Sequence, residues 1–216
     1  MSELEIQQVL ALAHSFKTIF DMLYIVKYTG PFGYIKPWTA VRDSETFSQQ
    51  FLTPSIVEGM EKKLFPEMLD HPGEILKIKR HRLNYMGLSA QQERTWSKAE
   101  VVKTVEKRKY RLRELSILTR NVMLEPNLYL AFSEKTDAEQ AFSQHICLCR
   151  NEDVLLPEEL LTISGEEEFD QIEGFELLFR EAGTGFKVGH NRFAFGESMF
   201  GELKVFGNPI RQPNAF

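Results

Sequence analysis

LYIVKYTGPFGYIKPW at residues 23–38 and TPSIVEGMEKKLF at residues 53–65 predict a strand, a long loop and a helix, in that order. Residues 22–29 are apolar or aromatic on both faces, which is typical of a strand in the middle of a sheet. Thr53 suits a helix N-cap and Pro54 suits the first helical position, so the helix is expected over 54–65. The intervening loop carries aromatic and basic side chains between Gly and Pro residues. Loops of about twenty residues inside a compact domain are often functional.

The remaining elements follow from capping signals and hydrophobic periodicity. A helix is predicted over 3–18, from a capping box at Ser2 and Glu5. Further helical segments are predicted at 97–107, at 136–143 and, as one turn in an acidic loop that spans 152–170, at 157–161. Strands are predicted at 75–85, 115–118, 128–132, 145–150, 174–179 and 201–207, with turns or loops at 68–73 and 183–192.

This order of elements predicts an α+β fold with a ferredoxin-like (RRM-like) sheet and additional C-terminal strands. Basic groups occupy both faces of the strand at 75–85, near its end, which does not suit a buried strand. We therefore expect the chain to leave the sheet there as a projecting basic arm and to return through residues 115–118. Sheets of this type that bind RNA leave one face free for nucleotides.

The charge of the chain is distributed unevenly. The net charge is −5, yet residues 77–120 carry 13 basic and 4 acidic residues, whereas residues 121–216 carry 7 and 17. A basic segment within an acidic chain predicts a polyanion-binding surface on one part of the molecule, although it can also be a solvated face. There is no long apolar run and the N-terminus is acidic, so we expect an intracellular protein that does not associate with a membrane.

Three short motifs carry residues that could bind a metal ion or a phosphate group. His145, Cys147 and Cys149 share one face of a predicted strand, but one strand cannot surround a tetrahedral ion, so no metal or cofactor is expected. The glycine-rich stretch 183–192 matches neither a P-loop nor a dinucleotide fingerprint, and its basic residues favour an RNA contact. The acidic run 166–170 is expected to be solvated rather than a two-metal site.

Lys79, Arg80 and His81, together with Tyr34, leave two interpretations open. They could cleave RNA without a metal, because such cleavage needs a base for the 2′-hydroxyl and a cation for the phosphate. They could equally bind RNA through phosphate contacts, which is the interpretation we favour.

GPFGYIKP at 30–37, VRDSETF at 41–47 and LTPSIVEGM at 52–60 resemble the N-terminal part of the Cas-five family of CRISPR-associated proteins, in the RAMP superfamily. Residues 148–150 and the glycine-rich stretch 183–201 are similar to later segments of that family. The resemblance covers about a fifth of the chain. The helix expected at 3–18 precedes the strand that usually opens the family.

The resemblance implies a ferredoxin-like RAMP domain over 22–216 with a thumb at about 84–112, preceded by an N-terminal helical extension over 1–21. It implies a subunit of a Cascade-like effector complex that caps the 5′ handle of the guide RNA (crRNA), in the cytoplasm of a prokaryote. The partners would be CRISPR backbone subunits and a large or nuclease subunit. Some relatives also process precursor crRNA, so a metal-independent endoribonuclease is the alternative, and a scaffold that binds only protein is a third possibility.

We predict that RNA is bound by residues from the loop, the basic strand, the arm and the glycine-rich stretch. They are Tyr34, Lys36, Trp38, Arg42, Lys77, Lys79, Arg80, His81, Arg82, Lys107, Arg108, Lys109, Arg111, Lys187, His190 and Arg192.

Overall fold

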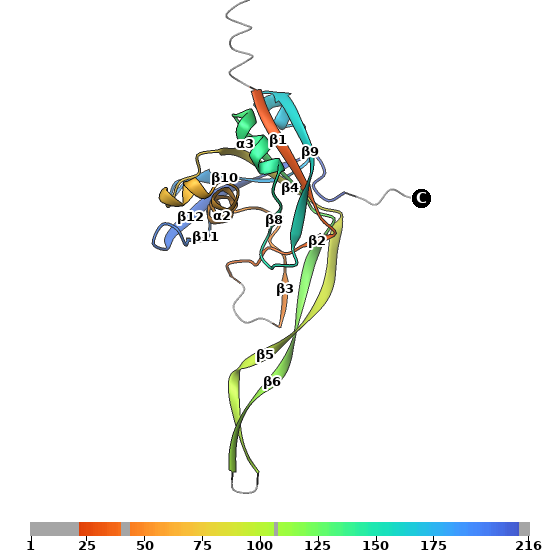
Figure 1. The fold of residues 1–216 in the computed structure, drawn as a ribbon, viewed down its shortest axis with the longest axis vertical. Coiled ribbons are helices and arrows are strands. Elements are labelled where there is room, and N and C mark those ends of the chain that lie inside the picture. Colours follow the sequence, from red (N-terminus) through yellow and green to blue (C-terminus); the bar gives the residue numbers. More distant parts are fainter. Residues whose placement is uncertain (1–21, 40–43, 106–107, 212–216) are drawn as a thin grey trace, which may run out of the picture.

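The computed structural model describes residues 22–39, 44–105 and 108–211 (Figure 1). The helix expected at 3–18 lies outside these residues. Strands predominate among the described elements, and nearly all strand pairs are antiparallel, so the fold belongs to the α+β class. The helical elements are α2 (Pro54–Leu64), the 3-10 helix η1 (Pro66–Asp70), α3 (Lys135–Phe142) and α4 (Glu166–Phe169). The strands are β1 (Met22–Thr29), β2 (Phe32–Gly33), β3 (Glu45–Phe47), β4 (Ile78–Asn84), β5 (Gly87–Val105), β6 (Arg108–Leu124), β7 (Asn127–Phe132), β8 (Ile146–Cys147), β9 (Val154–Ser164), β10 (Gly174–Arg180), β11 (Phe186–Asn191) and β12 (Glu197–Phe206).

The larger sheet has the strand order β11-β12-β10-β4-β7-β1-β9-β8. The chain passes from β1 through α2 to β4 with β7 lying between the two strands, and from β7 through α3 to β9 with β1 between them. β1 is paired on both sides, as expected for a strand that is apolar on both faces. The C-terminal strands β10, β12 and β11 extend the sheet beyond β4.

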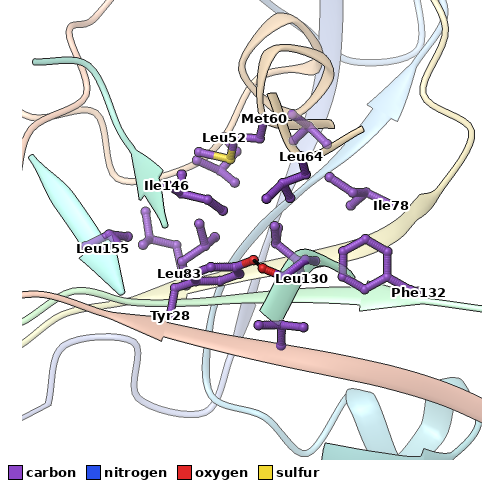
Figure 2. Packing of buried hydrophobic residues seen from close by; sticks show 14 of the residues in the cluster. Tyr28, Leu52, Met60, Leu64, Ile78, Leu83, Leu130, Phe132, Ile146 and Leu155 are labelled. Carbon is purple, nitrogen blue, oxygen red and sulfur yellow. Dashed lines mark hydrogen bonds between the residues drawn. The ribbon is translucent and has the colours of Figure 1, made fainter. Parts of the chain in front are cut away.

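Both crossover helices cover the same face of this sheet and enclose the main core. Val57, Met60 and Leu64 of α2 and Ala138 and Ala141 of α3 belong to one buried cluster with the sheet residues, part of which Figure 2 shows. Because Pro54 occupies the start of α2, the helix begins where the sequence predicts, although no side chain caps it. α3 begins at Lys135 after Glu134, one residue before the predicted start at 136, and it also lacks a side-chain cap.

β5 and β6 form a long antiparallel hairpin, called the arm below, that reaches away from the body of the molecule (Figure 1). The arm extends from Gly87 to Leu124, further along the chain than expected. The helix predicted over 97–107 is wrong over residues 97–105, which are part of β5, while residues 106–107 lie outside the described residues. The sequence of the segment explains this result, since Val101, Val102, Thr104 and Val105 are β-branched residues that favour strands.

The acidic loop predicted over 152–170 is wrong in its first part, which forms β9 and pairs with β1. Pro157 obscured this strand in the sequence, because proline cannot donate a ladder hydrogen bond. The structure accommodates Pro157 where the β1–β9 register shifts, between Lys27 and Tyr28. Two further predictions are corrected, since the strand expected at 145–150 is only Ile146–Cys147 and part of the expected 183–192 loop is β11.

Candidate nucleic-acid interface

Arg80 and Arg82, which the sequence predicts as phosphate contacts, form ion pairs with carboxylates of the protein. Glu176 of β10 accepts hydrogen bonds from Arg80 Nε (2.6 Å), Arg80 Nη2 (2.6 Å) and Arg82 Nη2 (2.9 Å). Asp170 and Glu166 add contacts to Arg80 at 2.8 and 3.1 Å. Burial alone would raise the pKa of Glu176, but the hydrogen bond from Arg80 and the neighbouring positive charges outweigh burial and lower it.

Arg82 is also enclosed by aromatic rings and fully buried. Its guanidinium carbon lies 3.5 Å from the ring centroid of Phe206 and 4.8 Å from that of Phe169. Phe169 belongs to α4, which covers this part of the other face of the sheet. The structure therefore contradicts the expectation that Arg80 and Arg82 are open to RNA, because both serve a buried ion-pair network.

His81 and Tyr34 are buried as well, so neither is positioned to contact a base. His81 is 4% exposed and stacks on Phe179 with ring centroids 5.3 Å apart. Tyr34 is 2% exposed, and its hydroxyl lies 2.7 Å from Thr46 Oγ1. The two side chains have different neighbours, and the structure does not assemble Tyr34, Lys79 and His81 into the cleavage site considered above.

Lys77 and Lys79 differ in their surroundings. Lys77 Nζ pairs with Asp137 at 2.6 Å and with Glu67 at 3.3 Å, which neutralises it locally. Lys79 is exposed, and its ammonium donates to the carbonyl of Leu76 at 2.6 Å.

Trp38, Lys187 and His190 are brought together on the surface, although about 150 residues separate the first from the others. Lys187 Nζ lies 5.7 Å from the Trp38 ring centroid, and the ring of His190 meets that of Trp38 edge-on at 6.1 Å. Gly189, between the two basic residues of β11, has φ +135°, and a Cβ there would lie 3.3 Å from Trp38 Cγ. Glycine at this position therefore allows Trp38 to approach β11 closely.

We call Trp38, Lys187 and His190 the Trp38 cluster. Trp38 remains 48% exposed, so one surface of its ring system is open to a ligand. An exposed indole beside an ammonium group such as that of Lys187 is a combination that binds unpaired nucleobases, through stacking and phosphate attraction.

Lys36 and Arg192 line a pocket beside α2, together with Lys63, which the sequence analysis did not single out. Lys63 was missed because its partners in the pocket are distant in sequence, and a single lysine at the end of a helix carries no distinctive signal.

The arm has a basic outer part and an apolar middle on the same face. Lys109, Arg111 and Arg113 of β6 are exposed and have the same strand parity as Leu115 and Ile117, which are 55% and 57% exposed. Trp96 of β5 pairs with Leu115 and is 61% exposed. The sequence analysis missed the apolar residues, although the alternation of β6 could have revealed that they share a face with the arginines.

Three predicted contacts cannot be placed. Arg42 and Lys107 lie outside the described residues, as does the side chain of Arg108. In the described part of the chain no group of three or more His, Cys, Asp or Glu side chains is arranged to hold a metal ion. No helix among the residues described is long and apolar enough to cross a membrane.

Comparisons with known proteins found neither a matching family model nor a matching curated protein. The solved structures that are similar to this chain include two that are described as follows. One is described as "CRISPR RNA-guided surveillance complex", with a TM-score of 0.49, 10% identity, and coverage of 89% of this chain and 91% of that chain. The other is described as "Crystal structure of Cas protein", with a TM-score of 0.39, 14% identity, and coverage of 89% and 100%.

The described residues thus define a class of protein, an α+β chain built on a mostly antiparallel sheet, with a projecting β-hairpin. The exposed basic residues of the arm and of the Trp38 cluster are separate from the ion pairs that Arg80 and Arg82 form with Glu176.

Proposed function

We propose that this chain binds single-stranded RNA as a subunit of a CRISPR ribonucleoprotein effector, where it caps the 5′ handle of the guide RNA. The observation that carries this proposal is the arm, on which Lys109, Arg111 and Arg113 share an exposed face with Leu115 and Ile117. Cations attract the phosphate backbone, and apolar side chains beside them can contact unstacked bases.

The topology supports the same proposal. The order β9-β1-β7-β4, with α2 and α3 as the crossovers, supports a ferredoxin-like palm in this proposal, and the arm, between the second and third of these strands along the chain, would serve as the thumb. The likeness of residues 30–60 to the Cas-five family adds to this assignment. In that role the chain would contact an adjacent backbone subunit and a large or nuclease subunit.

This proposal includes fewer RNA-binding residues than the sequence suggested. Lys109, Arg111 and Arg113 of the arm and the Trp38 cluster form the proposed surface, while Arg80, His81 and Arg82 hold the fold together. Tyr34 and His81 are both buried, so this proposal assigns them no contact with RNA.

The salt dependence of RNA binding tests the role of the arm. The triple variant K109Q/R111Q/R113Q should bind a single-stranded handle RNA more weakly, with a shallower dependence of log Kd on log salt, because each lost phosphate contact removes about 0.7 from the slope. Fluorescence anisotropy across a series of salt concentrations measures both quantities.

The matched control is K135Q/R180Q/K204Q, which removes the same charge from exposed side chains of α3, β10 and β12. It should retain the wild-type slope within error. Equal slopes for the arm variant and the wild type would exclude the arm as an RNA contact.

A further inference from the structure

A second basic site lies beside α2. It is a pocket of about 460 Å³ between one side of that helix, from Ser55 to Lys63, the loop at residues 35–36 and the segment at 146–149. Lys36, Lys63 and Arg192 supply three positive charges, while Ile35 and Ile56 contribute apolar wall. No described residue that lines the pocket is acidic.

No carboxylate in the described part of the chain neutralises the positive charge of this pocket. The ammonium of Lys63 donates to the backbone carbonyl of His145, and partial burial lowers the pKa of Lys63. Among the described residues, no carboxylate forms an ion pair with Lys36, Lys63 or Arg192. Arg80 and Arg82 differ in this respect, because each donates hydrogen bonds to Glu176. The three cations of the pocket could therefore bind an anionic ligand.

Gly59 of α2 provides an independent indication that the position of Arg192 matters. Glycine inside a helix is unfavourable relative to alanine, yet here a Cβ would lie 2.7 Å from Arg192 Nη2. The glycine therefore lets the guanidinium lie against the wall of the helix, and the ring of Phe193 supports it, with the Arg192 guanidinium carbon 4.8 Å from that ring's centroid.

We propose that this pocket binds the phosphate group of a nucleotide. A guanidinium and two ammonium groups suit phosphate oxygens, and the N-terminal end of α2, whose Ser55 and Ile56 line the pocket, adds the positive potential of the helix dipole. The volume lies within the range of small-ligand sites, and the apolar wall can take the base or ribose. The site is separate from the arm, so the proposal does not require the CRISPR role.

Cys147 and Cys149 make the proposal directly testable. Both thiols line the pocket, both are exposed, and they are the two cysteines of the whole sequence. The rate of alkylation by iodoacetamide, which is uncharged and so not attracted by the cations, reports on access to this pocket alone. Mass spectrometry of the full chain measures the rate at each cysteine.

AMP should slow alkylation of both cysteines, and adenosine at the same concentration should not, because it lacks the phosphate. R192Q and K63Q should each raise the AMP concentration needed for protection about tenfold or more. K135Q, which changes an exposed lysine on α3, should leave it unchanged. G59A should raise Tm through better helix propensity while weakening protection, since the new methyl group displaces Arg192.

Two oligonucleotides then distinguish the source of the phosphate. Protection by a 5′-phosphorylated single-stranded RNA but not by its 5′-hydroxyl counterpart identifies a terminal phosphate. Equal protection by both identifies an internal phosphodiester, and protection by AMP alone identifies a free mononucleotide. Alkylation rates that neither AMP nor either RNA alters would overturn the pocket proposal, whereas loss of salt-dependent RNA binding in the wild type would overturn only the proposed function.

Discussion

His81 is an ionisable residue held inside the sheet without a hydrogen-bond partner for Nε2. Burial lowers the pKa of His81 to about 4 from an ordinary value near 6.5, with Arg80 and Arg82 contributing in the same direction against the opposing charge of Glu176. The folded protein therefore keeps the imidazole neutral at a pH where the unfolded chain protonates it.

The stability of the protein should fall as the pH decreases from about 6.5 to about 4. In this window the unfolded state takes up a proton that the folded state does not, so acidification favours unfolding, by up to about 3 kcal/mol from this one group. Urea denaturation at intervals across the window gives the slope of the unfolding free energy against pH.

H81L should flatten this slope, because it removes the titrating group and retains an apolar side chain against Phe179. H71Q, at an exposed histidine, serves as the control and should leave the slope unchanged. If H81L and the wild type lose stability in parallel, His81 is not responsible for the acid sensitivity.

At the scale of elements, Glu61 joins α2 to the start of β4. Its carboxylate is buried and accepts backbone hydrogen bonds from Leu76 (2.8 Å), Lys77 (2.8 Å) and Ile78 (2.7 Å). The three N–H donors satisfy the hydrogen-bonding capacity of this buried carboxylate, so Glu61 fixes the entry of the chain into β4.

Replacing Glu61 with Ala should destabilise the protein by about 3 kcal/mol or more, because it leaves backbone N–H groups buried without acceptors. E61Q should cost less, since its amide oxygen still accepts hydrogen bonds. E139A, at an exposed glutamate of α3, should stay within about 0.5 kcal/mol of the wild type. Chemical denaturation measures all three, and similar stabilities for E61A and E139A would contradict this role.

At the scale of the whole molecule, the arm and the body are held together near the base of the arm. β5 pairs with β6, and β6 also pairs with β2 and β3, through residues 119–124. Val122 and Met123 are buried at this base, whereas Leu115 and Ile117, further out along β6, are exposed. The outer arm therefore makes little contribution to the core.

A shortened chain in which residues 94–117 are replaced by an Asn-Gly turn should fold with nearly the same Tm as the full chain, because Glu93 and Leu118 are paired and can close a hairpin. The same chain should bind single-stranded RNA more weakly and with a shallower salt dependence. Differential scanning fluorimetry and anisotropy titrations test the two expectations, and a large fall in Tm would show that the outer arm supports the body.

Local patterns in the sequence were sufficient to identify the central strand 22–29, the helix after Thr53 and the α+β class. They also predicted that the chain leaves the sheet near residue 84, but the expectation that the cations there are not buried was wrong, because Arg80 and Arg82 lie in the central strand β4 with Glu176 as their partner. The β5 segment was misassigned because a polar stretch can be amphipathic as either helix or strand, and pairing with β6 decides between them.

The sequence by itself determined where the positive charge lies, but only the tertiary structure decided which cations are available. Arg80 and Arg82 are neutralised by Glu176, more than ninety residues later, because β10 pairs beside β4. Lys36, Lys63 and Arg192 converge on one pocket from three separate segments. The physical reason is that charge compensation depends on distances of a few ångströms, which are set by strand order and not by spacing along the chain.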